Sequence, residues 1–217
     1  MKSKFMVIVL LAMLVAGVHS ASAQVRKWEL EVGAGAITPT SKLEFDKNTV
    51  GWNAMAEVRR NFGALPLDLG LRVDGNVFNR KYEELEDLLH TQFSSLNVMA
   101  VADLNVLRAK QISFFVGAGL GYGWLAAENQ VINPEIPESL KDKYEAFKTV
   151  KETSVLTVMP RVGIELFHHL RATLYYKVHA GSKDEQLKDL VKGQGHFGLS
   201  LGVVLGGGLK NKAKDKE

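Results

Sequence analysis

The side chains best suited to chemistry in this sequence are histidines and carboxylates, because none of its 217 residues is a cysteine. That absence excludes disulfides, thiolate metal sites and cysteine nucleophiles. His179 and His196 lie at the adjoining ends of the last two predicted strands. Asp184 or Glu185, in the loop between them, could complete a transition-metal site. No ligand spacing supports such a site. We therefore expect two ordinary polar residues there, with no metal and no other cofactor.

A second group with chemical potential is a set of twelve charged residues. They alternate with apolar residues, which places them on one face of a β-strand. Seven are acidic and five are basic: Glu29, Glu31, Glu57, Asp68, Asp74, Asp103 and Glu165 against Arg59, Arg72, Arg161, Arg171 and Lys177. Acidic and basic side chains on the same face suit a buried network of ion pairs, because charges removed from water need partners. Such a network either plugs an interior and fixes strand register, or lines a narrow ion path.

The elements that position these residues follow from the same alternation, which predicts eight strands of about 9 to 13 residues. The segments are 28–36, 52–62, 67–77, 96–106, 112–124, 156–166, 170–178 and 197–205. Long links (37–51, 78–95, 125–155 and 179–196) alternate with short ones (63–66, 107–111 and 167–169). Short links join antiparallel neighbours, so all long links leave from one end of the sheet. Closing that sheet removes its two edges and predicts an all-β, eight-stranded antiparallel up-and-down barrel.

Residue size and position predict that the apolar face points outward, as in a transmembrane barrel. The polar face is rich in small residues, including Gly117, Gly119, Gly121 and Gly123, which suit a narrow interior better than a solvent face. Aromatic residues of the apolar face fall at strand ends and predict two girdles. They are Trp28, Phe62 and Phe114 near the short links, and Trp52, Tyr122, Trp124, Tyr176 and Phe197 near the long ones. Arg60 is the one outward charge and lies near a rim.

The first 23 residues predict a cleaved signal peptide. Lys2 and Lys4 precede an apolar stretch over 5–18, and Ala21-x-Ala23 follows as the cleavage pattern. We expect residues 24–209 to form the barrel and the charged tail 210–217 to extend into the periplasm. Without the two leader lysines, 25 of the 27 basic residues remain, against 24 acidic residues. This near-neutral balance makes no electrostatic case for nucleic acid.

The leader, eight amphipathic strands, tight turns and long loops together resemble small Gram-negative outer-membrane β-barrels. The barrel domain of outer-membrane protein A and the outer-membrane protein X family are the nearest in kind, and the strand Val116–Trp124 is typical of porin-family proteins in Bacteroidota. The resemblance implies location in a bacterial outer membrane. Two features depart from the pattern. The last strand is followed by glycines and the tail rather than ending on an aromatic residue, and Pro160 predicts a bulge.

The function expected is a structural or surface-interaction role without enzymatic activity or catalytic residues. A narrow channel is the alternative. A lipid A-modifying enzyme comes third, because the outward positions of the predicted strands hold no serine, threonine, histidine or carboxylate. Expected partners are outer-membrane lipids and lipopolysaccharide, and an extracellular protein or ligand at loops 78–95 and 125–155, with the chain a monomer. Short amphipathic helices over 82–89, 138–150 and 187–191 either cap the barrel or present a binding surface.

Overall fold

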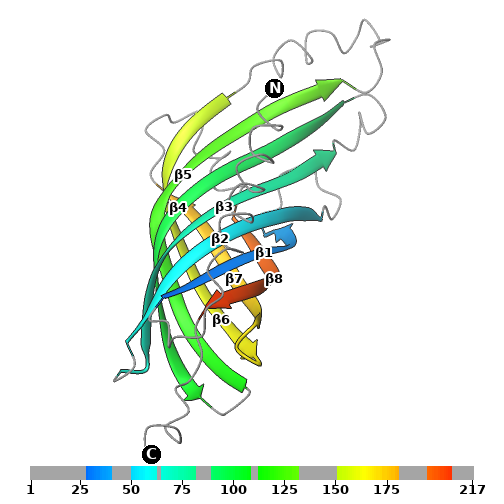
Figure 1. Ribbon diagram of the computed structural model, residues 1–217. Coiled ribbons are helices and arrows are strands. Elements are labelled where there is room, and N and C mark those ends of the chain that lie inside the picture. The colour runs from blue at the N-terminus through cyan, green and yellow to red at the C-terminus, as the bar shows by residue number, and fades with distance from the viewer. Residues whose placement is uncertain are drawn as a thin grey trace, which may run out of the picture.

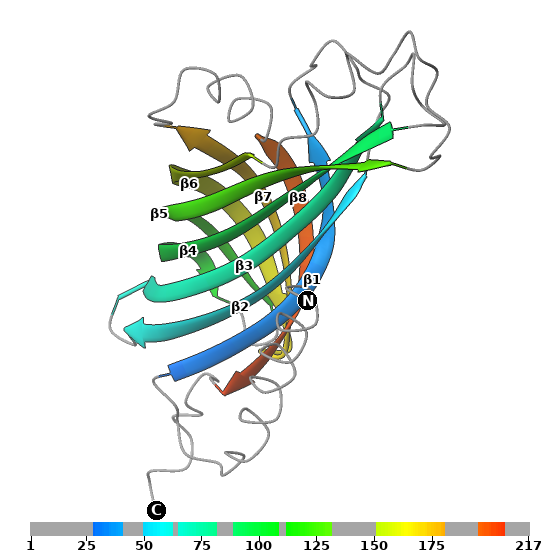
Figure 2. The same ribbon diagram turned by 90° about the horizontal axis from the view of Figure 1, so that it is seen from above.

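The structure, a computed structural model, describes residues 28–40, 50–62, 65–81, 89–108, 112–131, 151–180 and 195–206. Eight strands fill these ranges: β1 (Trp28–Pro39), β2 (Gly51–Phe62), β3 (Leu67–Lys81), β4 (Leu89–Arg108), β5 (Ile112–Val131), β6 (Lys151–Leu166), β7 (Leu170–Ala180) and β8 (His196–Gly206). Each strand pairs antiparallel with its neighbours in sequence, and β1 also pairs with β8, which closes the barrel (Figure 1 and Figure 2). The predicted up-and-down barrel is confirmed. No helix in these ranges could cross a membrane.

Most apolar side chains of the strands face outward and most polar ones face the interior, as predicted. Along β7 and β8, exposed and buried residues alternate almost one by one, and the exposed ones include Leu170, Leu174 and Leu201. The outward apolar row of β2 runs from Trp52 to Phe62. Ten residue steps of about 3.3 Å, tilted by about 40°, span roughly 25 Å, which is the height of the apolar band of an outer-membrane barrel. The fold is therefore a transmembrane β-barrel.

Four strands, β3, β4, β5 and β6, continue furthest beyond the ends that the alternation predicts, by four to seven residues at the long-loop end. β3 runs to Lys81, β4 begins at Leu89, β5 runs to Val131 and β6 begins at Lys151. Parts of the predicted loops 78–95 and 125–155 are therefore strand, paired as Lys81 with His90 and Leu89 with Val131. These extensions make one side of the barrel taller than the other (Figure 1), and we call them the tall wall. The helices predicted over 138–150 and 187–191, and 82–88 of the first, lie outside the described residues.

The bulge predicted at Pro160 is wrong. Pairing of β6 with β7 is interrupted at Met159 and Pro160, yet its register is the same on both sides of the gap. Proline has no N–H to donate to β7, so two pairs are lost without an inserted residue. The register shift lies elsewhere, in β4 between Asn105 and Leu107.

The β6–β7 link spans three residues, 167–169, and contains a tight turn from Leu166 to His169. Phe167 and His168 have φ values of 54° and 59°, and the amide of His169 donates to the carbonyl of Leu166 at 3.1 Å. Positive φ at both central residues is the type I′ geometry that matches the right-handed twist of paired strands. The turn fixes the register of β6 and β7, and with it the height at which Glu165 and Arg171 face each other.

Candidate functional site

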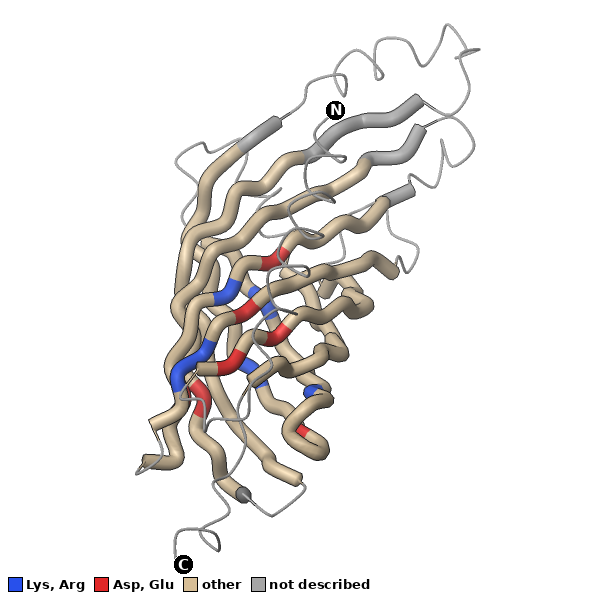
Figure 3. The backbone as a smooth tube through the Cα atoms, viewed as in Figure 1, with Lys and Arg blue, Asp and Glu red and all other residues tan. Residues whose placement is uncertain are grey.

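The structure places all twelve charged residues of the predicted network inside the barrel, and every one of them is buried. We call this set the lumen network. Its members come from β1, β2, β3, β4, β6 and β7, and gather mainly in the half of the barrel nearer the short turns, as Figure 3 shows. The inward positions of β5 and β8 hold glycine at several levels, including Gly117 and Gly202. Those glycines leave room for the charged side chains of the other strands: a Cβ on Gly117 would lie 2.0 Å from an Asp103 oxygen.

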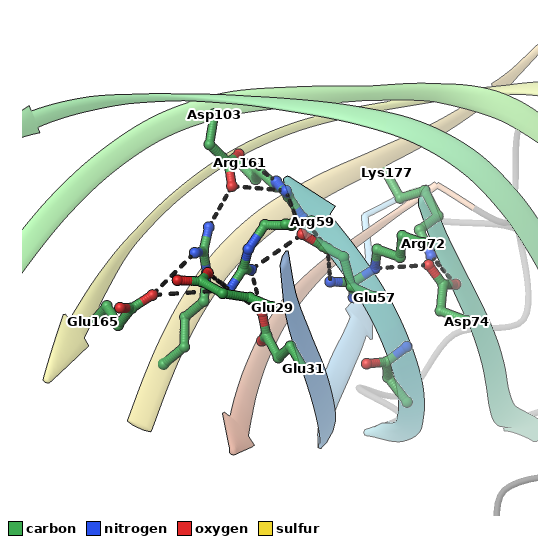
Figure 4. A network of polar contacts seen from close by, with 12 residues as sticks. Glu29, Glu31, Glu57, Arg59, Arg72, Asp74, Asp103, Arg161, Glu165 and Lys177 are labelled. Carbon is green, nitrogen blue, oxygen red and sulfur yellow. Dashed lines mark hydrogen bonds and ion pairs between the residues drawn. The ribbon is translucent and has the colours of Figure 1, made fainter. Parts of the chain in front are cut away.

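Arg59 of β2 holds the carboxylates at the short-turn end together. Its Nη1 lies 2.5 Å from Glu31 Oε2 and 3.1 Å from Glu57 Oε1. Its Nη2 lies 3.2 Å from Glu29 Oε2 and 3.8 Å from Glu165 Oε2 (Figure 4). One guanidinium therefore serves four carboxylates from β1, β2 and β6, as its five donors in a fixed plane allow.

Arg161 of β6 connects opposite sides of the lumen. Its two terminal nitrogens donate to Glu57 of β2 at 2.5 and 2.8 Å, and its Nε and Nη2 donate to Asp103 of β4 at 2.8 Å each. Both contacts are bidentate, the strongest arrangement for an arginine–carboxylate pair. In a barrel of eight strands β2 and β6 are diametrically opposite, so this side chain spans the interior.

Arg171 of β7 completes the group around Asp103. It donates to Asp103 and, at 3.3 Å, to Glu165, and its guanidinium carbon lies 3.5 Å from the centre of the Phe115 ring. The ring face is electron-rich and attracts the cation. Nε of Arg171 also lies 3.5 Å from Glu31, so this side chain is held among three carboxylates and an aromatic ring.

A second charged group lies nearer the long-loop end, around Asp74. Lys177 Nζ donates to Asp74 Oδ1 at 2.5 Å, and Arg72 Nε donates to Asp74 Oδ2 at 3.1 Å. Asn76 and Asn97 donate to the same carboxylate at 2.9 and 3.0 Å. Lys177 is on β7 and Asp74 on β3, another diametrically opposite pair. Arg72 also lies 3.5 Å from Glu57 and so joins the two groups.

Amide side chains compensate the excess of carboxylates at the short-turn end. Asn61 donates to Glu29 at 2.5 Å, and Asn105 donates to Asp68 at 2.6 Å. A buried carboxylate that accepts such bonds is less costly than one without a partner. The sequence indicated which residues face the lumen, but these amide partners depend on pairing across strands.

The interior also holds apolar side chains, which the alternation of polar and apolar residues did not predict. Ile37, Phe78, Phe93, Met99, Val101, Met159 and Tyr175 form one buried cluster. The signal was present in the inward positions that break the polar rule, among them Met99, Met159 and Tyr175. The rings of Tyr175 and Phe115 each lie against a glycine of the paired strand. A Cβ on Gly198 would lie 2.1 Å from Tyr175 Cζ, and one on Gly163 would lie 2.3 Å from Phe115 Cζ.

His179 and His196 are both buried near the long-loop end, with ring centroids 6.1 Å apart. His179 Nδ1 lies 3.0 Å from the hydroxyl of Thr157. Asp184 and Glu185 lie outside the described residues. Within the described ranges, no three histidine, aspartate or glutamate residues come together as a metal-binding group.

The outward aromatic residues fall into two groups along the strands. Trp52 and Phe197 are exposed next to the long-loop ends of β2 and β8, whereas Tyr122 and Trp124 are exposed within β5, which continues to Val131. The half-buried Tyr176 ring is tilted by 35° to the Phe197 ring, with centroids 4.7 Å apart. Trp28 and Phe114 are exposed at the short-turn end, where Phe62 is half-buried. Arg60 lies between two of these rings, 5.7 Å from the Trp28 centroid and 5.3 Å from that of Phe62.

Comparison with known proteins supports the fold through structure alone, since no family model and no curated protein matches the chain. Neisserial surface protein A superposes with a TM-score of 0.54 at 13% identity, covering 84% of this chain and 99% of that one. This is the fold of a small outer-membrane β-barrel. The predicted resemblance is confirmed at that level.

Two other small barrels are similar at lower TM-scores. The attachment invasion locus protein Ail of Yersinia pestis gives 0.45 at 17% identity, over 82% of this chain and 99% of that one. The N-terminal barrel domain of OprF from Pseudomonas aeruginosa gives 0.40 at 12% identity, over 83% of this chain and 98% of that domain.

Proposed function

We propose that this chain is a non-enzymatic protein of a bacterial outer membrane, with a plugged barrel that carries a surface-interaction region at its long-loop end. Outer-membrane barrels have short turns in the periplasm and longer loops outside the cell. In that orientation the tall wall and the segments 78–95 and 125–155 face the exterior. The outward apolar band and its two aromatic rims support the membrane location.

The observation that carries the plug is the pairing of charges between opposite strands at two levels. Arg161 reaches Glu57 across the lumen, and Lys177 reaches Asp74 across it nearer the long-loop end. An eight-stranded barrel has an interior just wide enough for side chains to fill. Salt bridges that span such an interior leave ions no continuous path unless buried pairs separate.

Buried methionines add a second barrier inside the barrel: Met99 and Met159 belong to the apolar cluster, and Met55 lies outside it. Met55, Met99 and Met159 alternate with polar inward residues on β2, β4 and β6. On each of these strands the inward neighbour of the methionine toward the long-loop end is polar. Toward the short turns the inward neighbour is charged on β2 and β6 and is Val101 on β4. Apolar constrictions exclude water and ions, so this layer supports a closed lumen.

Conductance in a planar bilayer tests the plug. The protein is first refolded and its insertion checked by heat-modifiable migration on a gel. We expect a folded barrel that carries no reproducible single-channel current. Steady channels in the unmodified protein would contradict the plug.

A narrow channel remains the second candidate, and one observation favours it. Both terminal nitrogens of Arg72 and Oε1 of Glu31 are buried and have no hydrogen-bond partner among the described residues. Such atoms suit water inside the lumen, because buried polar groups are ordinarily hydrogen-bonded. If the barrel conducts, Arg72→Gln will change the current, whereas Leu71→Ala on the outward face of the same strand will not.

Mass spectrometry of lipid A tests the alternative that the barrel is a lipid A-modifying enzyme. A lipid A-modifying barrel would change the mass spectrum of lipid A in cells that produce it. We expect an unchanged spectrum, and a new acylation or deacylation product would contradict a non-enzymatic role.

A further inference from the structure

The outer surface of the barrel carries a groove at the short-turn end, centred on Arg60. The groove has a volume of about 280 Å³ and is lined by Trp28 of β1, by Val58, Arg60 and Phe62 of β2, and by Leu69, Gly70 and Leu71 of β3. Register explains its shape. Trp28, Arg60 and Leu69 form one row across the three strands, and Val58 and Leu71 form part of the next row toward the middle of the barrel.

Arg60 is chemically unlike the rest of this surface. Among strand residues whose side chains the structure describes, it is the one charged residue on the outward face. It makes no ion pair with a described residue, whereas neighbouring Arg59 faces four carboxylates in the lumen. The rings of Trp28 and Phe62 hold the guanidinium at the surface.

The position of the charge within the apolar band identifies what it can meet. Arg60 is two residues from the end of β2, at the edge of the outward apolar surface. An arginine is costly at the middle of a bilayer and costs little near its interface. At the interface the abundant anionic group is a lipid phosphate, which arginine binds through two parallel hydrogen bonds.

We infer that this groove binds one glycerophospholipid of the periplasmic leaflet, with its headgroup phosphate on Arg60 and an acyl chain between Val58 and Leu71. This inference rests on the membrane location and orientation proposed above. Charge complementarity selects a phosphate-bearing lipid. The short-turn position selects the periplasmic leaflet, and the apolar row toward the middle of the barrel gives the chain its path.

Native mass spectrometry of the refolded mature protein tests the inference. Detergent micelles are doped separately with dioleoyl phosphatidylglycerol, dioleoyl phosphatidylethanolamine and dioleoylglycerol, which lacks phosphate. We expect one retained copy of either phospholipid and no retained dioleoylglycerol. Arg60→Gln should lower phospholipid retention at least about tenfold, because a hydrogen bond to a charged group contributes about 1.5–3 kcal/mol.

A matched pair of aromatic variants separates this site from general lipid contact. Phe62 and Phe114 both face outward at the short-turn rim, but only Phe62 contacts Arg60. Phe62→Ala should weaken retention, and Phe114→Ala should leave it unchanged. Equal losses in these two variants, unchanged retention in Arg60→Gln, equal retention of dioleoylglycerol, or displacement by inorganic phosphate alone would overturn the inference.

Folding is read separately from binding. If the unmodified protein becomes heat-modifiable and inserts but shows no Arg60-dependent lipid, this inference fails and the membrane barrel stands. If the protein never becomes heat-modifiable in lipid, the membrane location fails and the lipid site with it.

Discussion

Arg59 and Arg60 are adjacent residues of one type with opposite surroundings. Successive side chains of a strand point to opposite faces, so one arginine enters the lumen and the other faces outward. Arg59 is buried among Glu29, Glu31, Glu57 and Glu165. Arg60 is exposed and contacts two aromatic rings. The role of a charged residue in this barrel therefore depends on the parity of its position.

At the residue scale, Arg161→Met should destabilise the barrel strongly. It leaves Glu57 and Asp103 without the cation that binds both of them bidentately. Removing one partner of a buried ion pair costs about 3–5 kcal/mol. Urea unfolding in lipid vesicles, followed by tryptophan fluorescence, measures the change.

The adjacent outward residue provides the control for that variant. Val162→Ala changes a side chain that is 45% exposed on the same strand, and we expect a loss below about 1 kcal/mol. If Arg161→Met unfolds at the same urea concentration as Val162→Ala, the buried pairs do not stabilise the fold as described.

At the element scale, the turn between β6 and β7 uses two residues poorly suited to its geometry. Phe167 and His168 both adopt positive φ, a conformation that costs residues other than glycine about 1–2 kcal/mol each. His168→Gly relieves one of these costs and loses a 3.7 Å contact with Glu165. We expect a net gain of about 1 kcal/mol in the free energy of unfolding, measured by urea titration. His168→Val, which is more restricted at positive φ, should lose stability; a gain there would contradict the argument.

The strands were predictable where both faces have a fixed environment. Between Trp52 and Phe62, lipid on one side and the lumen on the other impose an alternation broken only by inward Met55 and outward Arg60, and β2 was predicted to within one residue. Above the long-loop rim that constraint ends. The segment Thr91–Ser95 places polar residues at both parities, so the beginning of β4 could not be recognised.

The same limit applies to the lumen network. Parity indicated that all twelve charged residues face one side, because parity depends only on position along each strand. The partner of each charge depends on the register of strands that are not neighbours, such as β2 with β6. Nothing in the local pattern around Glu57 indicates that Arg161, rather than Arg171, is its bidentate partner.

At the scale of the whole molecule, the barrel should fold without the segment between β5 and β6. Replacing residues 132–150 by a short Gly-Ser linker leaves the described ladders of β4 with β5 and of β5 with β6 intact. Loop length contributes only weakly to stability, so the free energy of unfolding should change by less than about 1 kcal/mol. Heat-modifiable migration and urea unfolding measure this.

Deletion of one strand residue is the control for the loop replacement. Removing Gly119 moves every later side chain of β5 to the opposite face, and we expect no heat-modifiable form. If the loop replacement also abolishes folding, residues 132–150 are required by the barrel itself and their proposed role as a separable surface region is wrong.

The long-range salt bridges constrain how the chain enters a bilayer. Arg161 and Glu57 are 104 residues apart, and Lys177 and Asp74 are 103 apart. Neither cation meets its carboxylate until the strands between them are in place. A hairpin of β6 and β7 that entered alone would carry Arg161 and Lys177 through hydrocarbon without these carboxylates, where polar groups lack partners. We therefore expect insertion and closure to be concerted, with β1 and β8 joining as these cations cross the membrane with their partners.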